Sequence, residues 1–262
     1  MDNLVFKGQE HELVLPSGRK IVIRETNGDD DEMLSNLKDA KSGDNLTNFL
    51  ANIVVSDSLI PVKTPTTVDV LAWPVSDRYY ALFKQRIINQ GHLMKFDFIC
   101  QAEDCPSQKS GDKAIAMEQD LNEYDGDLAD SNYKPVLVTS VKKYPNGTKS
   151  LVEFETSSKK KLRFKILNGI LQKKQLDDTG ANSNKNSQLY IREIELYTGG
   201  NWIILTHFKM FPSREMSEIR KLVEDSDPFF YPMVKFNCPH CKTPYSLPLF
   251  EIPVFYWPEE RI

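Results

Sequence analysis

The stretch KFNCPHCKTPYSL, residues 235–247, places two cysteines three positions apart between two β-prone segments. Two thiolates cannot complete a structural zinc site, because such sites take four ligands in a tetrahedron. The chain has only two further cysteines, in the stretch FICQAEDCPS at residues 98–107. We therefore predict that the two pairs meet at one metal ion, although they lie in different halves of the chain.

Each cysteine pair follows an extended run, HLMKFDFI before Cys100 and PMVKFN before Cys238, and is followed by polar turn residues. A cysteine-bearing turn at the end of a hairpin, a knuckle, presents two sulfur atoms toward one point. Two facing knuckles would supply four ligands and leave no open position for water, so the predicted site is structural. The predicted ligands of a structural Zn²⁺ are Cys100, Cys105, Cys238 and Cys241. Iron is the alternative metal, since four thiolates suit both.

Other uses of the cysteines are open at this point. A redox-active CxxC pair would be expected in a βαβ setting, and no helix signal follows Pro239 and His240. A disulfide or plain free thiols would also fit the spacing. His240 could replace one sulfur, but four cysteines suffice without it, and we expect its side chain to be exposed.

The composition is that of an ordinary globular protein, with 262 residues, 40% hydrophobic and 27% charged, and a net charge of −4. No apolar run approaches the roughly 18 residues needed to cross a bilayer. The first residues, MDNLVFKGQEHELVL, lack the basic and apolar regions of a secretory signal. We therefore expect no membrane partner and a reducing compartment, where cysteines favour metal over disulfide.

Hydrophobic periodicity predicts alternating strands and helices along the chain. Strands are expected in the hairpin at 11–25, at 92–99 and 113–121, and in the β-rich region 134–166, which contains an Asn146-Gly147 turn. Helices are expected over 28–43, 45–57, 69–73, 76–91 with a Ser76 cap and a Gly91 stop, and 211–228 with a Ser213 cap. The stretch 188–202 is ambiguous, and we favour a helix that ends at Gly199-Gly200.

These elements predict an α+β fold, with small helices packed on antiparallel β-hairpins and a four-cysteine zinc ribbon joining the two knuckles. Three regions are expected: an N-terminal hairpin and helical region at 1–91, the first knuckle with a β-rich region at 92–178, and a helix, the second knuckle and an apolar tail at 179–262. They should form one intertwined unit, because Cys100 and Cys238 must meet.

The C-terminal stretch LPLFEIPVFYWP is unusually apolar. Its aromatic residues are Phe250, Phe255, Tyr256 and Trp257. They either close the back of the zinc ribbon or bind a partner protein, and the sequence does not decide between the two.

Motifs of common enzyme classes are missing from the sequence. It contains no phosphate-binding GxxxxGK[ST] or GxGxxG, no HExxH and no GxSxG, and its carboxylates are scattered. We therefore expect a protein that is not an enzyme and has no small-molecule substrate. The run KKKLRFK and a helix with Arg78 and Arg86 suggest an alternative function, a zinc-ribbon module that binds nucleic acid or acts in transcription. The acidic net charge argues against it.

Four stretches in a fixed order resemble one protein family. They are KIVIRE at 20–25, VDVLAWPVSDRYYALFKQRIINQG at 68–91, KFDFIC at 95–100 and FNCPHC at 236–241. In this order they resemble the baseplate hub assembly proteins of T4-like contractile-tailed bacteriophages, although the first pair is CxxxxC where CxxC is more often expected. The resemblance implies a late viral protein that assembles the tail hub through contacts with other baseplate hub proteins. It also implies a location in the host cytoplasm during assembly, and leaves open whether the protein stays in the virion.

Overall fold

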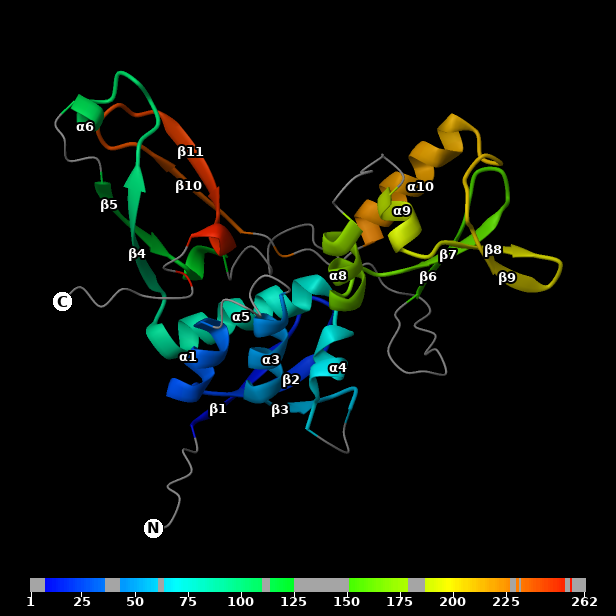
Figure 1. The fold of residues 1–262 in the computed structure, drawn as a ribbon, viewed down its shortest axis with the longest axis horizontal. Helices are drawn as coiled ribbons and strands as arrows, with labels where there is room; N and C mark the ends of the chain where they lie inside the picture. The colour runs from blue at the N-terminus through cyan, green and yellow to red at the C-terminus, as the bar shows by residue number, and fades with distance from the viewer. Residues whose placement is uncertain are drawn as a thin grey trace, which may run out of the picture. The chain divides into compact units, whose positions relative to one another are not determined.

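A computed structural model describes most of the chain (Figure 1). The described residues are 8–35, 43–60, 64–109, 114–124, 151–178, 187–226, 230, 232–252 and 255. The chain divides into two compact units, each built from two separate segments. Unit 1 comprises Met1–Arg78 and Tyr133–Phe229, and unit 2 comprises Tyr79–Asn132 and Phe230–Ile262. These divisions do not coincide with the boundaries at 91 and 178 expected from the sequence.

The N-terminal part of unit 1 is a three-stranded antiparallel sheet with two helices inserted before its last strand. The strands β1 (Glu10–Val14), β2 (Lys20–Arg24) and β3 (Val54–Asp57) lie in the order β1-β2-β3. The predicted hairpin β1–β2 is confirmed, and its turn contains Gly18 with a φ of 83°. The helices α1 (Gly28–Ser35) and α3 (Asp44–Ile53) follow β2, and α3 buries Phe49, Leu50 and Ile53.

Two further helices follow this sheet. Helix α4 (Thr67–Leu71) starts with a capping box in which Thr66 and Asp69 bond each other's backbone N–H. Helix α5 (Val75–Gln90) begins before Ser76, so the predicted Ser76 cap is wrong, and Ser76 is a buried residue of the first turn. The predicted stop is confirmed: Gly91 has a φ of 78°, and its N–H donates to the Ile87 carbonyl at 2.9 Å.

The second part of unit 1 is a four-stranded antiparallel sheet. Its strands are β6 (Leu151–Glu155), β7 (Lys161–Lys165), β8 (Glu195–Thr198) and β9 (Asn201–Ile204), in that order. Helices α8 (Gly169–Asp178), α9 (Ser187–Ile191) and α10 (Ser213–Ser226) accompany it. The N-terminal part is linked to α8, because Lys173 pairs with Asp44 and Arg78 donates to Gln172.

The predicted helix over 188–202 is mostly wrong. Only α9 is helical, and the rest of the stretch forms the antiparallel hairpin β8–β9. Gly199 and Gly200 both have positive φ, 57° and 85°, as the central residues of a two-residue type I′ turn require. The two glycines therefore reverse a strand rather than end a helix.

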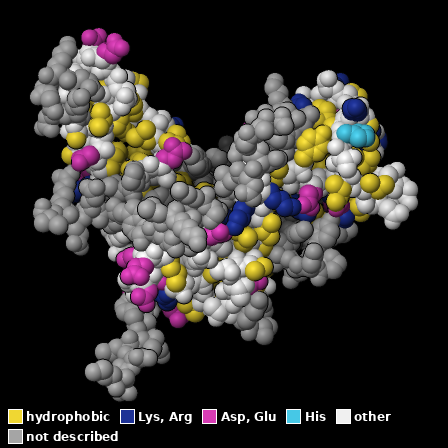
Figure 2. Space-filling view, in the orientation of Figure 1, with side chains coloured by type: hydrophobic (Ala, Val, Ile, Leu, Met, Phe, Trp, Pro, Cys, Tyr) yellow, Lys and Arg dark blue, Asp and Glu magenta, His cyan; other side chains and the backbone are white. Residues whose placement is uncertain are grey.

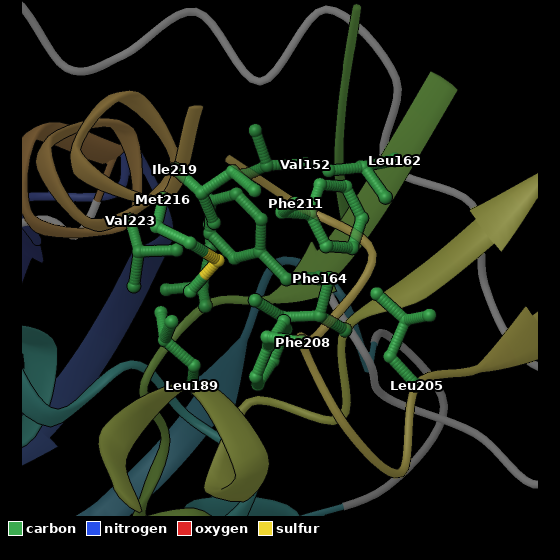
Figure 3. Packing of buried hydrophobic residues seen from close by; sticks show 12 residues of the cluster. Val152, Leu162, Phe164, Leu189, Leu205, Phe208, Phe211, Met216, Ile219 and Val223 are labelled. Atoms are coloured by element: carbon green, nitrogen blue, oxygen red, sulfur yellow. The ribbon is translucent and has the colours of Figure 1, made fainter. Parts of the chain in front are cut away.

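The core of the second part of unit 1 lies between this sheet and α10 (Figure 3). The buried cluster consists of Val152, Leu162, Phe164, Ile166, Leu189, Ile194, Leu205, Phe208, Phe211, Met216, Ile219 and Val223. Met216, Ile219 and Val223 form the predicted apolar stripe of α10, and Leu222 packs against the cluster from its edge. The predicted helix in this region is thus confirmed.

Unit 2 contains two antiparallel hairpins. Strands β4 (Leu93–Ile99) and β5 (Ala114–Asp120) form one, and β10 (Met233–Asn237) and β11 (Pro244–Pro248) form the other. Short helices α6 (Pro106–Lys109) and η1 (Leu249–Glu251) follow β4 and β11. In β4 every second residue is buried, which places Met94, Phe96 and Phe98 on the inner face.

One predicted part of the chain lies outside the described residues. It is the Asn146-Gly147 turn together with most of the β-rich region before β6. The described parts nevertheless establish the predicted α+β class with antiparallel sheets. Within the described part of the chain, no helix has both the length and the apolar character needed to span a bilayer.

Candidate metal centre

The four cysteines of the chain lie together in unit 2. Their sulfur atoms are all within 4.8 Å of one another. Cys100, Cys105 and Cys238 are buried, and Cys241 is half-buried. The structure therefore brings together all four residues that the sequence nominated as metal ligands.

Each pair is positioned by the end of a strand. Cys100 directly follows the last residue of β4, and Cys238 directly follows the last residue of β10. In the second knuckle the Cys238 N–H donates to the Thr243 carbonyl, and the Lys242 N–H donates to the Cys238 carbonyl, both at 2.9 Å. Lys242 takes a φ of 63° to close this turn, a backbone conformation that a non-glycine residue rarely adopts.

The spacing of the sulfur atoms fits a tetrahedral metal site. The closest sulfurs pair across the knuckles: Cys100 with Cys241 at 3.6 Å, and Cys105 with Cys238 at 3.8 Å. A metal–sulfur distance of about 2.3 Å gives a tetrahedron with edges of about 3.8 Å. A disulfide would need the sulfurs at about 2 Å, so these cysteines are free thiols in the structure.

Three hydroxyl groups surround the sulfur atoms. The Tyr245 hydroxyl lies 3.1 Å from Cys100 Sγ and accepts a hydrogen bond from the Gln101 N–H at 2.9 Å. Ser107 Oγ lies 3.1 Å from Cys105 Sγ, and Thr243 Oγ1 lies 3.2 Å from Cys241 Sγ. Hydroxyls in these positions can donate to metal-bound thiolates, and such bonds orient the ligands and disperse their charge.

Sequence reasoning missed these three hydroxyls, although a signal for two of them exists. Ser107 stands two residues after Cys105, and Thr243 stands two residues after Cys241, so each knuckle ends in the pattern cysteine-x-hydroxyl. Tyr245 has no such local signal, because its position depends on β11 folding back beside the other hairpin.

The surroundings of Cys241 and Cys100 shift the pKa values of these two thiols in opposite directions. Contacts with the side chain and backbone of Thr243 lower the pKa of Cys241 to about 6. Burial raises the pKa of Cys100 to about 11. A metal ion that binds all four sulfurs as thiolates must therefore displace the proton of Cys100, which makes binding pH-dependent.

An aromatic cluster connects the two hairpins beneath the cysteines. Phe98 lies between Phe236 and Tyr245, with ring centroids 4.8 Å and 4.5 Å away, and Phe96 contacts Phe236 at 5.9 Å. Because the same tyrosine also contacts Cys100, the packing of the hairpins and the geometry of the sulfur cluster depend on each other.

The predicted partner-binding aromatics are placed as follows. Phe250 and Phe255 are buried in unit 2 and contact each other at 5.1 Å. Phe250 also contacts Tyr79 and Phe230. For these two residues the structure supports packing against the unit rather than binding a partner. Tyr256 and Trp257 lie outside the described residues.

Of the residues nominated for a nucleic-acid surface, Lys159 and Lys161 of the run KKKLRFK are exposed, whereas the two nominated arginines are not. Arg78 and Arg86 are buried: Arg78 donates to the Thr47 hydroxyl at 2.6 Å, and Arg86 donates to the Gly91 carbonyl at 3.0 Å. His240, which could have replaced a cysteine, is exposed as expected.

The fold and the cluster together define an α+β protein with a candidate four-cysteine metal centre in which distant chain segments meet. No family model, curated protein or solved structure matches the chain.

Proposed function

We propose that this protein is a non-enzymatic, zinc-stapled assembly factor or structural subunit of the baseplate hub of a contractile phage tail. It acts through contacts with other hub and tail proteins. The observation that carries the proposal is the cluster of four mutually close cysteine sulfurs, three of them from buried residues. Four such ligands would complete the coordination of a metal ion and leave no position for water. Such a centre stabilises a shape and performs no chemistry.

Zinc is the metal we propose for this centre. Four thiolates suit zinc and iron, but a protein whose role is structural needs no redox chemistry, and Zn²⁺ has none. In zinc-finger peptides the metal contributes on the order of 10 kcal/mol to folding. The two short hairpins of unit 2 need such a contribution, because an isolated two-stranded hairpin is only marginally stable in water.

The order of the four stretches that resemble hub assembly proteins supports the second part of the proposal. Two of them, KFDFIC and FNCPHC, form the ends of β4 and β10 with their cysteines. A third contains α4 except for its first residue, and the whole of α5. Two of the four resembling stretches thus supply three of the four cysteines of the candidate metal centre, whereas KIVIRE forms β2 in unit 1 and the third stretch runs from unit 1 into unit 2. The proposed location is the host cytoplasm during assembly and, for a hub subunit, the tail baseplate of the virion.

The test is affinity capture of the full-length protein from phage-infected cells, followed by native mass spectrometry and metal analysis. We expect one zinc ion per chain and co-purifying hub or tail polypeptides in defined stoichiometry. A Cys238→Ser/Cys241→Ser variant is the control, and it should lose the metal. A protein that arrives without tail proteins would contradict the assembly role. Capture with nucleic acid that survives about 0.1 M salt would favour the nucleic-acid module.

A further inference from the structure

Exposed apolar side chains concentrate in one part of unit 1. Among the described residues, ten large hydrophobic side chains are exposed, and five of them lie between residues 190 and 210. They are Tyr190, Tyr197, Ile203, Ile204 and Met210. Figure 2 shows hydrophobic side chains gathered over the β8–β9 hairpin, with Lys and Arg side chains beside them. Contiguous exposed apolar surface of this kind marks interaction sites on soluble proteins.

This surface includes the edge of a sheet. Strand β9 is the last strand in the order β6-β7-β8-β9, and within the described ranges no strand pairs with its outer side. The Leu205 N–H, just after β9, donates to the carbonyl of Ile194, just before β8, at 2.8 Å. Leu205 and Ile194 therefore form a hydrogen-bonded pair that continues the β8–β9 ladder. Because such pairs alternate along an antiparallel ladder, Ile203 bonds toward β8, whereas the backbone groups of Trp202 and Ile204 point outward.

The outer edge of β9 carries none of the usual chemical protection. Proteins commonly protect edge strands with charged residues, prolines or bulges. The sequence of β9 is NWII, without a charge or a proline, and its pairing with β8 is regular. Ile203 and Ile204 are each just over half exposed. The strand therefore offers both backbone hydrogen bonds and apolar side chains to an incoming strand.

The charge of the surrounding segment is one-sided. From residue 196 to residue 214 the chain contains no Asp or Glu, and its charged residues are Lys209 and Arg214, both exposed. The flanking carboxylates Glu195 and Glu215 are buried and paired with Arg163 and Lys160. In a protein of net charge −4, the segment that contains this edge strand is therefore cationic.

We propose that the outer edge of β9 binds an extended, acidic peptide segment of a partner protein, which adds a fifth strand to the sheet. Backbone bonds to Trp202 and Ile204 supply affinity, apolar side chains of the peptide cover Ile203 and Ile204, and its carboxylates face Lys209 and Arg214. This is recognition by strand addition. The proposal deepens the assembly role and rests on it only for the existence of a protein partner.

A single-stranded nucleic acid fits the same surface less well. Base stacking needs an open aromatic face. One side of the Trp202 ring carries the Arg163 guanidinium, 4.3 Å from the ring centroid, and Tyr197 contacts the ring at 5.2 Å. The exposed hydrophobic side chains of β9 are the aliphatic Ile203 and Ile204, and these suit apolar peptide side chains.

The experiment uses the full-length, metal-loaded protein and a random dodecapeptide library displayed on yeast. Peptides selected on the wild-type protein should be acidic, with alternating apolar residues. The Kd of these peptides, measured by fluorescence polarisation, should rise roughly tenfold or more for Ile204→Pro. A tenfold rise in Kd corresponds to about the net strength of one lost hydrogen bond. Ile204→Pro removes an outward donor and no bond to β8. Methylation of alternate peptide nitrogens should have a similar effect.

Two further variants test the apolar contact without changing the charge. Ile203→Ser should weaken binding, whereas Leu59→Ser, equally exposed at 53% but located just after β3 in the N-terminal part of unit 1, should leave it unchanged. Circular dichroism and unfolding midpoints check that each variant folds. Selected peptides that bind Ile204→Pro as well as the wild type, or that carry no excess of acidic residues, would overturn the proposal.

The other occupants give different results. A concentration-dependent dimer that Ile204→Pro abolishes would assign the edge to a second copy and overturn the peptide assignment. Salt-sensitive binding of an oligothymidylate probe that Ile204→Pro abolishes would assign it to nucleic acid. If hub proteins co-purify with the wild type and with Ile204→Pro alike, the assembly role stands and the β9 assignment fails. If no tail protein co-purifies but acidic peptides bind β9, the β9 assignment stands and the assembly role fails.

Discussion

Cys100 Sγ and Cys241 Sγ lie 3.6 Å apart, although 141 positions separate the two residues in the chain. The same is true of Cys105 and Cys238, which lie 133 positions apart in sequence and 3.8 Å apart at their sulfurs. Each close pair joins one knuckle to the other, so a metal at this point links the two hairpins rather than closing either one. A metal bound here would therefore stabilise unit 2, whereas unit 1 has an apolar core of its own.

Removing the metal should loosen unit 2 and leave unit 1 largely intact. Chelation of the wild type, or Cys238→Ser, is expected to raise amide hydrogen exchange in β4, β5, β10 and β11, because metal binding energy on the order of 10 kcal/mol in comparable small sites contributes directly to folding. Exchange in β6 and β7 should change little. Hydrogen-exchange mass spectrometry measures both sets of strands in one sample.

Added Zn²⁺ provides the control for this prediction. It should restore slow exchange to the chelated wild type and not to Cys238→Ser, which lacks one ligand. Protection of the four strands that is unaffected by chelation, in protein confirmed to be metal-free, would contradict the stapling role.

The Tyr245 hydroxyl should tune the metal affinity. Tyr245→Phe keeps the ring that contacts Phe98 and Phe236 but removes the hydroxyl beside Cys100 Sγ. Loss of such an outer-shell bond typically weakens metal binding by roughly 10- to 100-fold. Competition with a chromophoric chelator measures the change.

Tyr197→Phe is the matched control, since it removes a hydroxyl from an exposed tyrosine of the other unit. It should leave the affinity for metal as it is in the wild type. Equal affinities of Tyr245→Phe and wild type would mean that this hydroxyl serves only the backbone of Gln101.

The cysteines could be found from sequence and the hydroxyls could not, for a physical reason. Four cysteines in two pairs form a rare pattern with few chemical uses, whereas Ser, Thr and Tyr occur throughout the chain. The contact of Tyr245 with Cys100 depends on the packing of two hairpins whose strands are far apart in sequence. Local patterns do not encode that packing.

The fold shows the same division between local and distant information. The hairpin β1–β2 and helix α10 follow from periodicity and turn residues, and both are confirmed. The hairpin β8–β9 was missed because its apolar residues fit helical and extended spacing alike, and the buried surface that selects the strand comes from β7. Each unit is built from two segments that lie far apart in the sequence, and no local sequence pattern indicates which segments associate.

The stability of unit 1 should fall as the pH rises from about 4 to about 6 through one buried carboxyl. Burial raises the pKa of Asp77 from 3.8 to about 6, although hydrogen bonds from Ser17 oppose this shift. In that pH window the folded protein binds a proton more tightly than the unfolded chain does, so deprotonation favours unfolding. This shift in the pKa of Asp77 changes the free energy of unfolding by about 3 kcal/mol at most.

Asp77→Asn isolates this contribution. Urea unfolding at several pH values should show the wild type losing stability relative to Asp77→Asn between pH 4 and 6, with a constant difference above that window. Comparison with the variant is needed because carboxyls such as Asp30 and Glu215 have lowered pKa values and lose stability toward acid instead. A difference between the two proteins that does not vary with pH would refute the role of Asp77.

A single methyl group should disrupt the junction between α4, α5 and α8. A Cβ at Gly169 would lie 2.5 Å from Arg78 Nη1 and 2.8 Å from the Leu71 carbonyl oxygen. The backbone carbonyl cannot move aside easily, and the Arg78 side chain is buried with its hydrogen bond to Thr47. Gly169→Ala is therefore expected to destabilise unit 1 by about 2 kcal/mol or more, the scale of overpacking in a close-packed interior.

Gly28→Ala is the matched control, because it makes the same chemical change where no atom lies within 4 Å, and it should cost little stability. Thermal unfolding of both variants beside the wild type measures the contrast. Equal midpoints for the two would show that the junction tolerates the added methyl group, so the close approach of Gly169 to Arg78 would not be required for folding.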